Sequence, residues 1–162
     1  MLRISPDAWI SPLADIEESV RGTRIEIGAG CRIDSFVKIK SVGGDGEIVL
    51  GTNSYINSGT VIYSGNGVHI GSNVLIAANC TLAPVNHEFR DRNRLIVEQR
   101  FMPSRGGIIV ENDVWIGCNS VILDGAILRA GCVVAAGSVV RGELPAYAVC
   151  AGNPAVVKDY RK

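Results

Sequence analysis

An aliphatic residue returns at every sixth position along most of this chain, and this period constrains the fold more than any other feature. The longest series is Val110, Ile116, Ile122, Leu128, Val134 and Val140. Shorter series are Ile27, Ile33, Ile39; Leu50, Ile56, Ile62; and Ile70, Ile76, Leu82, with a weaker one at Ile4, Ile10, Ile16. A helix needs a period of about 3.6 residues, and antiparallel strands are usually punctuated by turns every 8–12 residues or so. We therefore expect neither.

Two further positions of the six-residue unit support the repeat. Three residues after the aliphatic position stand residue types that tolerate the positive φ of a tight corner, with Phe36 as the misfit. They are Gly30, Asn53, Gly59, Asn73, Asn79, Asp113, Asn119, Gly125, Gly131 and Gly137. One position later the residues are small or β-branched, as expected inside a narrow tube. They are Cys31, Val37, Ser54, Thr60, Val74, Cys80, Val114, Ser120, Ala126, Cys132 and Ser138. The columns predict a parallel solenoid in which three strand-and-corner units close one triangular coil.

Composition narrows the classes of function. The 162 residues fit a single domain over 1–162, and 16 basic against 16 acidic side chains create no net field for nucleic acid or an anionic membrane. The five cysteines form no CxxC pair, which suits a reducing compartment. The N-terminal residues lack the apolar run of a signal peptide, and no stretch approaches the ~18 apolar residues of a membrane span. We expect a cytoplasmic protein with no membrane insertion.

Interruptions of the period are expected to form loops. Two are short, at 41–49 and at 68–69, and one is long, over about 88–109. The long loop is rich in charged residues, namely Arg90, Arg92, Arg94, Arg100 and Arg105 with Glu88, Asp91 and Glu98. Loops of this length are usually functional or disordered, and a solvated surface loop is the alternative. After Val140 the pattern changes, and residues 145–162 are expected to cap the tube as an extended turn, with a short final helix as an option.

Histidine occurs only at positions 69 and 87. A zinc site built from imidazoles needs three of them, so we expect no metal site. His87 stands at the root of the long loop, where a rigidly held imidazole can take a proton from an attacking hydroxyl. A surface histidine without a task is the alternative. Cys31, Cys80 and Cys132 fall in the small inward column and are expected to be packing residues.

The unit [LIV]-[GAD]-x-x-[STAVC]-x resembles that of the hexapeptide-repeat acyltransferases, which implies an all-β, left-handed parallel β-helix. The hand follows from this resemblance alone, because parallel crossovers are otherwise right-handed. Within the resemblance, which covers about residues 50–157, the stretch 51–87 is similar to sugar O-acetyltransferases of the galactoside and maltose type and of polysaccharide biosynthesis. It implies that His87 is the general base and that Asn57 positions the acceptor. A corner asparagine that bonds the backbone remains an alternative for Asn57.

A second stretch carries the resemblance to a coenzyme A site. The segment 114–117, Val-Trp-Ile-Gly, resembles the family's VWIG signature, which implies that Trp115 lies along the pantetheine arm; a core or trimer contact is the alternative. The segments 135–138 and 151–155 are similar to those at the pantetheine amides and the adenosine end. Arg141 stands where relatives often carry Thr-Lys, and it can still pair with phosphate. The residues so assigned to acetyl-CoA are Trp115, Gly117, Cys118, Ala135, Ala136 and Arg141.

The resemblance implies direct transfer of acetyl from acetyl-CoA to a hydroxyl of a sugar or saccharide precursor, without a covalent intermediate. Asn57, Glu88 and Arg105 are expected to contact the acceptor. The family also implies a homotrimer with a cleft between subunits. Two alternatives stay open: an N-acetyltransferase acting on an aminosugar or other amine, and a non-catalytic β-helix with a structural or binding role.

Overall fold

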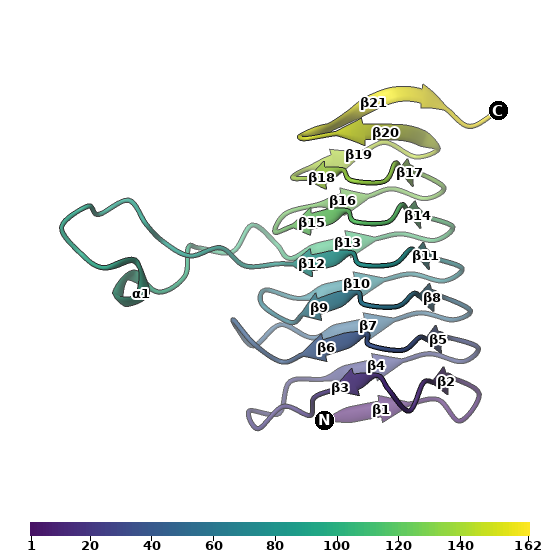
Figure 1. Ribbon diagram of the computed structural model, residues 1–162, viewed down its shortest axis with the longest axis horizontal. Helices are drawn as coiled ribbons and strands as arrows, with labels where there is room; N and C mark the ends of the chain where they lie inside the picture. The colour runs from purple at the N-terminus through teal and green to yellow at the C-terminus, as the bar shows by residue number, and fades with distance from the viewer.

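Each six-residue unit forms one short strand and one corner, and three successive units close one coil of a triangular prism (Figure 1). The computed structural model describes all residues 1–162. Face A comprises seven strands: β1 (Leu2–Ile4), β4 (Ile25–Ile27), β7 (Ile48–Leu50), β10 (Val68–Ile70), β13 (Ile108–Val110), β16 (Ile127–Leu128) and β19 (Glu143–Leu144). Face B comprises eight: β2 (Trp9–Ile10), β5 (Arg32–Ile33), β8 (Tyr55–Ile56), β11 (Leu75–Ile76), β14 (Trp115–Ile116), β17 (Val133–Val134), β20 (Ala148–Gly152) and β21 (Ala155–Tyr160). Face C comprises six: β3 (Asp15–Ile16), β6 (Lys38–Lys40), β9 (Val61–Tyr63), β12 (Thr81–Ala83), β15 (Val121–Leu123) and β18 (Val139–Val140).

The aliphatic column forms the core, as the period predicts. From Ile27 to Val140 every member is at most 3% exposed, and burying such a side chain stabilises the fold by roughly 1.5–3 kcal/mol. Ile4 pairs in register with Ile27 but is 40% exposed, because it belongs to the first coil and no further coil covers it. The weak N-terminal series is therefore part of the same stack.

The small inward column is also confirmed, since each of its members is buried. Burial raises the pKa of the thiols of Cys31, Cys80 and Cys150, and raises that of Cys132 to about 12. These thiols stay protonated near neutral pH and act as small packing groups.

The corner column adopts positive φ throughout, including the residue that did not fit the pattern. Phe36 has φ 64°, close to the 54° of Asn53 and the 69° of Gly30. Its ring is 62% exposed, so the side chain simply points into solvent. The stack imposes the backbone conformation of a corner even where the residue type disfavours it.

Several expected boundaries are wrong. The long loop spans 84–107 rather than 88–109, because Ile108 and Ile109 already pair with Val68 and His69 across β13 and β10. For the same reason 68–69 is strand and not loop; the extra residues of that unit lie at 64–67, between β9 and β10. A further insertion, at 17–24 between β3 and β4, was not expected.

The C-terminal segment contains no helix. Leu144, Ala148 and Cys150 are buried and continue the inward columns, so β19 and β20 extend the stack past Pro145. The chain then reverses, and β21 pairs antiparallel with β20. The expected start of the cap at 145 came too early because the unit between Val140 and Leu144 is two residues short, which disturbs the six-residue period.

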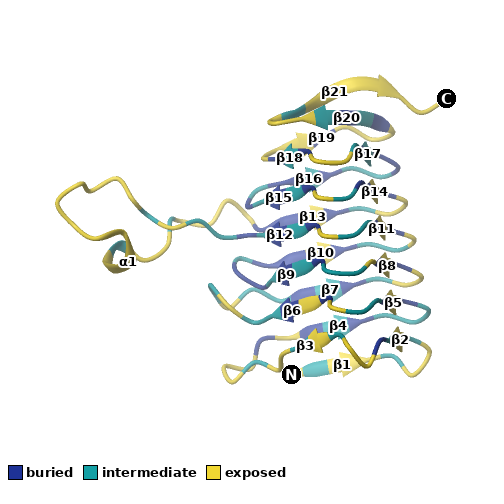
Figure 2. Cartoon of the chain, in the orientation of Figure 1, coloured by how far each residue is buried: buried dark blue, intermediate teal, exposed yellow.

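The loop over 84–107, here called the arm, leaves the prism between β12 and β13 and extends far from it (Figure 1). Its one helix, α1 (Ile96–Gln99), has four residues and no buried side chain, and most of the arm is exposed (Figure 2). At its root the outgoing and returning strands are bridged, since the amide of Met102 donates to the carbonyl of Asn86 at 2.8 Å. No helix in the chain has the length and apolar character needed to cross a membrane.

Candidate functional site

A pocket of about 530 Å³ opens where the arm leaves the prism, at the edge between faces C and A. The stack supplies one wall of this pocket and the arm supplies the other. Its lining residues come from the two ends of the arm and from the corners after β15 and β18; they are Asn86, His87, Phe89, Arg90, Met102, Arg105, Leu123, Asp124 and Arg141. A volume of this size is typical of small-molecule sites.

His87 lies in this pocket, as its position at the loop root suggested. Its main chain forms an antiparallel bridge with Phe101, and its ring lies 4.8 Å from that of Phe101 at an interplanar angle of 40°. The imidazole makes no hydrogen bond within the chain and is exposed to the pocket. A positioned and accessible imidazole of this kind is suited to general base catalysis.

Among the pocket residues that the sequence did not reveal, Asp124 has the most hydrogen bonds to its side chain. Its carboxylate is only 3% exposed and accepts hydrogen bonds from the amides of Arg105 at 2.8 Å and Gly107 at 2.9 Å, and from Asn66 Nδ2 at 3.1 Å. It thereby fixes the returning end of the arm to the prism. In the sequence, Asp124-Gly125 looks like any other corner, because the three donors are brought to it only by folding.

Three arginines give the pocket a positive character. Arg90 lies 3.7 Å from Glu88, whereas the guanidiniums of Arg105 and Arg141 form no ion pair. Arg141 makes one long contact of 3.4 Å, to Asn153 Oδ1. The expected acceptor contact Arg105 and the expected phosphate contact Arg141 are thus brought together beside His87.

Glu88 does not line the pocket. Its Oε1 accepts hydrogen bonds from the amides of Arg90 and Phe89, at 3.1 and 2.9 Å, and these bonds lower the pKa of its carboxyl. The side chain therefore stabilises the start of the arm in this subunit. No sequence pattern separates this turn-forming role from a ligand contact.

Asn57 lies in a different pocket, of about 240 Å³, at the edge between faces B and C. Its Nδ2 donates to the carbonyl of Ile76 at 2.8 Å, which is the backbone-bonding alternative raised from the sequence. Trp9, Arg32 and Asp34 share this pocket, with the Arg32 guanidinium 4.9 Å from the centroid of the Trp9 ring. The fold of a single chain therefore does not bring Asn57 and His87 together.

Trp115 stands on face B and is 51% exposed. It lines a third pocket, of about 240 Å³, with Leu75, Val133 and Arg161 among its neighbours. Trp115 is aligned with Leu75 and Val133 on the neighbouring strands, so its side chain forms part of an apolar column along the face. It is not a core residue.

Four more residues assigned to acetyl-CoA lie at the edge between faces B and C, namely Gly117, Cys118, Ala135 and Ala136. Gly117 is buried, and a Cβ there would lie 2.5 Å from the amide nitrogen of Ala136, so only glycine allows the two corners to stack. The carbonyl of Ala135 accepts a hydrogen bond from Ser138 Oγ at 2.6 Å, while Ala136 is exposed and Cys118 half-buried. Of the six residues, only Arg141 shares the pocket of His87.

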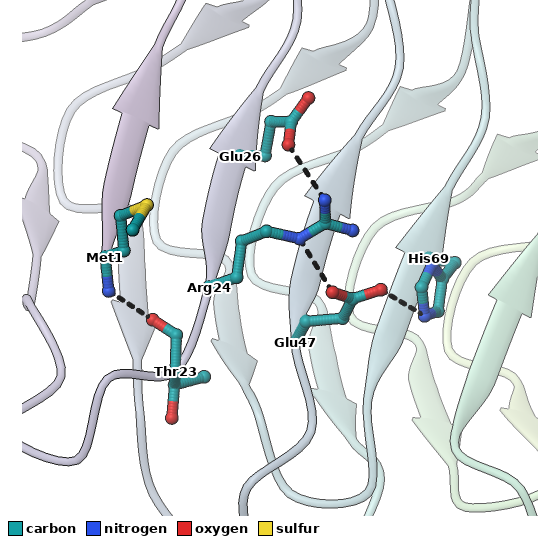
Figure 3. Close-up of polar contacts among 6 residues, drawn as sticks. All are labelled: Met1, Thr23, Arg24, Glu26, Glu47 and His69. Atoms are coloured by element: carbon teal, nitrogen blue, oxygen red, sulfur yellow. Dashed lines mark hydrogen bonds and ion pairs between the residues drawn. The ribbon is translucent and has the colours of Figure 1, made fainter.

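His69, the second histidine, lies on face A in a surface network of charges (Figure 3). Its Nε2 is 3.5 Å from Glu47 Oε1, and the other oxygen of Glu47 accepts a hydrogen bond from Arg24 Nε at 2.7 Å. This bond lowers the pKa of the Glu47 carboxyl. His69 lines none of the three pockets. No three histidine, cysteine or acidic side chains are grouped to hold a metal ion.

Two family models match the chain. One, described as bacterial transferase hexapeptide (six repeats), covers residues 107–142, and the other, described as hexapeptide repeat of succinyl-transferase, covers residues 49–84. Among curated proteins, a 2,3,4,5-tetrahydropyridine-2,6-dicarboxylate N-acetyltransferase of Staphylococcus aureus is 51% identical over 55 residues. That match covers 34% of this chain and 23% of the relative's length.

Solved structures share the whole fold. A mutant of AntD, an N-acyltransferase from Bacillus cereus, in complex with dTDP and coenzyme A, superposes with a TM-score of 0.83 at 22% identity over 99% of this chain and 84% of that one. A hexapeptide-repeat acetyltransferase from Vibrio cholerae, complexed with acetyl-coenzyme A, gives a TM-score of 0.73 at 28% identity over 84% of this chain and 71% of that one. The left-handed parallel β-helix expected from the resemblance is thereby confirmed.

Proposed function

We propose that the chain belongs to the hexapeptide-repeat transferases, whose models match two parts of it, and that it transfers an acyl group, in the simplest case acetyl, from coenzyme A to a small acceptor. The observation that carries this proposal is the accessible imidazole of His87, fixed at the root of the arm in a pocket of about 530 Å³. The two family models and the coenzyme A complexes of similar folds support it.

His87 accounts for the proton transfers that the reaction needs. A thioester is already activated, so no nucleophile of the protein is required. The imidazole accepts the proton that the acceptor loses as it attacks the thioester carbon, and returns it to the sulfur that departs. Each proton is accounted for, and His87 ends the cycle neutral.

The surface of this chain offers contacts for the pantetheine arm of coenzyme A. The exposed indole of Trp115 offers a flat apolar wall for a flexible thiol arm, and the small side chains at 135–137 leave the main chain of that corner open to a close approach. Arg141, also expected to contact the coenzyme, instead lies in the pocket of His87. Trp115 and the corner at 135–137 lie away from His87 within one chain, so the proposal requires a second subunit.

We propose a homotrimer in which each site is shared between neighbouring subunits. The arm supports this arrangement, because Leu95, Ile96 and Val97 at its tip are 67%, 57% and 79% exposed. Apolar side chains so far from the prism are unfavourable in water unless a partner covers them. Face B offers a partner surface, since its outward column includes Tyr55 and Leu75, both more than 40% exposed.

The acceptor proposed first is a hydroxyl of a sugar or saccharide precursor, with Asn57 and Arg105 as its contacts. An amine is the second candidate. It is favoured by AntD, an N-acyltransferase, and by the N-acetyltransferase relative from Staphylococcus aureus. The same base serves either acceptor, because both lose one proton in the reaction.

A thiol-release assay tests the proposal. The protein is given acetyl-CoA with matched acceptors such as glucose and glucosamine, and the products are treated with alkaline hydroxylamine, which cleaves esters but spares amides. Replacing His87 by alanine is expected to lower kcat by roughly 100-fold or more, a common effect of losing a general base. His69→Ala is the matched control and should keep full activity. Undiminished transfer by His87→Ala would end the proposed role.

A further inference from the structure

The pocket of His87 carries more positive charge than a general base and a neutral sugar require. Three guanidiniums line it, from Arg90, Arg105 and Arg141, against a single carboxylate, Asp124. With His87 neutral, the formal charge of the lining is three minus one, or +2. The whole chain, by contrast, has a formal net charge of zero, so the concentration of charge is local.

The one carboxylate is committed to other donors. Asp124 is 3% exposed and already accepts hydrogen bonds from the amides of Arg105 and Gly107 and from Asn66 Nδ2. It forms no ion pair with an arginine side chain. Glu88 lies close to Arg90 only, at 3.7 Å. The guanidiniums of Arg105 and Arg141 are therefore left without an anionic partner in the subunit.

The fold places these two arginines on separate supports around the imidazole. Arg105 belongs to the returning end of the arm, where its amide is fixed by Asp124, and Arg141 follows β18 at the prism edge. Two arginines that line one pocket from separate supports favour a carboxylate or phosphate, because such groups accept several charge-assisted hydrogen bonds at once.

We infer that the acceptor carries a carboxylate or phosphate group, which Arg105 and Arg141 bind. This inference rests on the proposed transfer, because it takes His87 to mark the position of the attacking atom. The anionic group then lies within one small pocket of the reaction centre. The phosphates of coenzyme A, in contrast, are held away from the thioester by the length of the pantetheine arm. The arginines therefore suit the acceptor rather than the coenzyme.

Histidine NMR offers a direct test, because the chain contains only two histidines. The protein, labelled in its histidine rings, is titrated with inorganic phosphate at constant pH and ionic strength. We expect the resonances of His87 to shift in a saturable manner while those of His69, on face A, stay in place. His87→Ala assigns the two signals.

Variants identify the groups that bind the phosphate. Arg105→Gln and Arg141→Gln should each weaken phosphate binding by about tenfold or more, the size expected for a charge-assisted hydrogen bond. Arg92→Gln is the matched control, because Arg92 is an exposed arginine of the arm that does not line the pocket. No saturable shift of His87, or an equal shift in all three variants, would overturn the inference.

A competition experiment with coenzyme A distinguishes an anionic acceptor from the phosphates of the coenzyme as the ligand of the two arginines. The phosphate titration is repeated with saturating coenzyme A. A retained shift of His87 supports an acceptor site, whereas a shift abolished by coenzyme A would assign the arginines to its own phosphates and contradict the inference. Because this experiment measures binding and not turnover, its failure is distinct from a failure of His87 as a base in the thiol-release assay.

Discussion

A single buried carboxylate, Asp124, ties the arm to the prism. Replacing it by alanine leaves the amides of Arg105 and Gly107 and the side-chain amide of Asn66 without their acceptor. We expect Asp124→Ala to lower the free energy of unfolding by about 2–4 kcal/mol, because each buried polar group left unpaired costs roughly 1–3 kcal/mol and water relieves part of this. Urea unfolding followed by circular dichroism measures the change.

The control for this variant is Asp45→Ala. The side chain of Asp45 is 89% exposed and lies 4.0 Å from Arg21, so its loss should change the free energy of unfolding by less than about 0.5 kcal/mol. Equal stabilities of the two variants would contradict the anchoring role of Asp124.

Acid should weaken the fold through carboxyls that accept hydrogen bonds in the native state. Arg129, and next the amide of Ala130, hold the pKa of Glu111 below its ordinary value of 4.5. A lowered native pKa adds stability above the pKa of the unfolded chain, and this stability is lost as the pH falls through the native pKa. The urea concentration at half-unfolding is therefore expected to decrease as the pH drops below about 4.5.

Glu111→Gln should make this acid-induced decline shallower, because the uncharged amide does not titrate. Glu18→Gln serves as the control, since Glu18 is exposed and makes no ion pair. A urea midpoint that stays level or rises between pH 5 and about 3 would refute the sign of the effect.

The candidate site residues differ in how far the sequence alone could identify them. His87 could be found because histidine is rare and marks the point where the period breaks. Asp124 could not, since its three hydrogen-bond donors lie 17 to 58 positions away and only folding brings them to it. Asn57 illustrates a third case: its residue type and spacing allowed two roles, and the structure shows it bonded to the backbone of Ile76 within one subunit.

At the scale of elements, the arm is the part of the chain that the repeat does not explain. The prism buries its own aliphatic column, but the arm leaves Leu95, Ile96 and Val97 exposed around α1. An isolated four-residue helix with no buried side chain gains little stability from its own contacts. The arm is therefore expected to become ordered against a neighbouring subunit.

Replacing Leu95, Ile96 and Val97 together by serine tests this expectation. The subunit should keep its stability within about 0.5 kcal/mol, because none of the three side chains is buried in it. The trimer, in contrast, should dissociate at higher protein concentrations than the unaltered protein, as measured by light scattering on dilution. Val20→Ser is the control, because Val20 is fully exposed in the insertion between β3 and β4. An unchanged dissociation profile would argue against docking of the arm.

The elements themselves were predictable wherever the period is unbroken. The aliphatic column identified the buried residue of each strand from β4 to β18, because six residues per prism side fix the inward positions. Errors arose where a change in unit length disturbs the phase, by two extra residues between β9 and β10 and by two missing residues between β18 and β19. The antiparallel return of β21 lies outside the repeat and carries no periodic signal.

At the scale of the whole molecule, the fold separates the residues expected to serve one reaction. His87 and Arg141 lie at the edge between faces C and A, whereas Asn57, Cys118 and Ala136 lie at the edge between faces B and C. A rigid prism cannot bring two of its own edges together. Threefold packing around an axis parallel to the stack can, because it sets one edge of each subunit against another edge of its neighbour.

A crystal structure of the protein with coenzyme A would test most directly whether the site is shared between subunits. We predict a trimer in which the thiol of each coenzyme A reaches the pocket of His87 from one subunit while its pantetheine arm lies along Trp115 of the next. A monomer, or a thiol bound away from the imidazole of His87, would contradict the account.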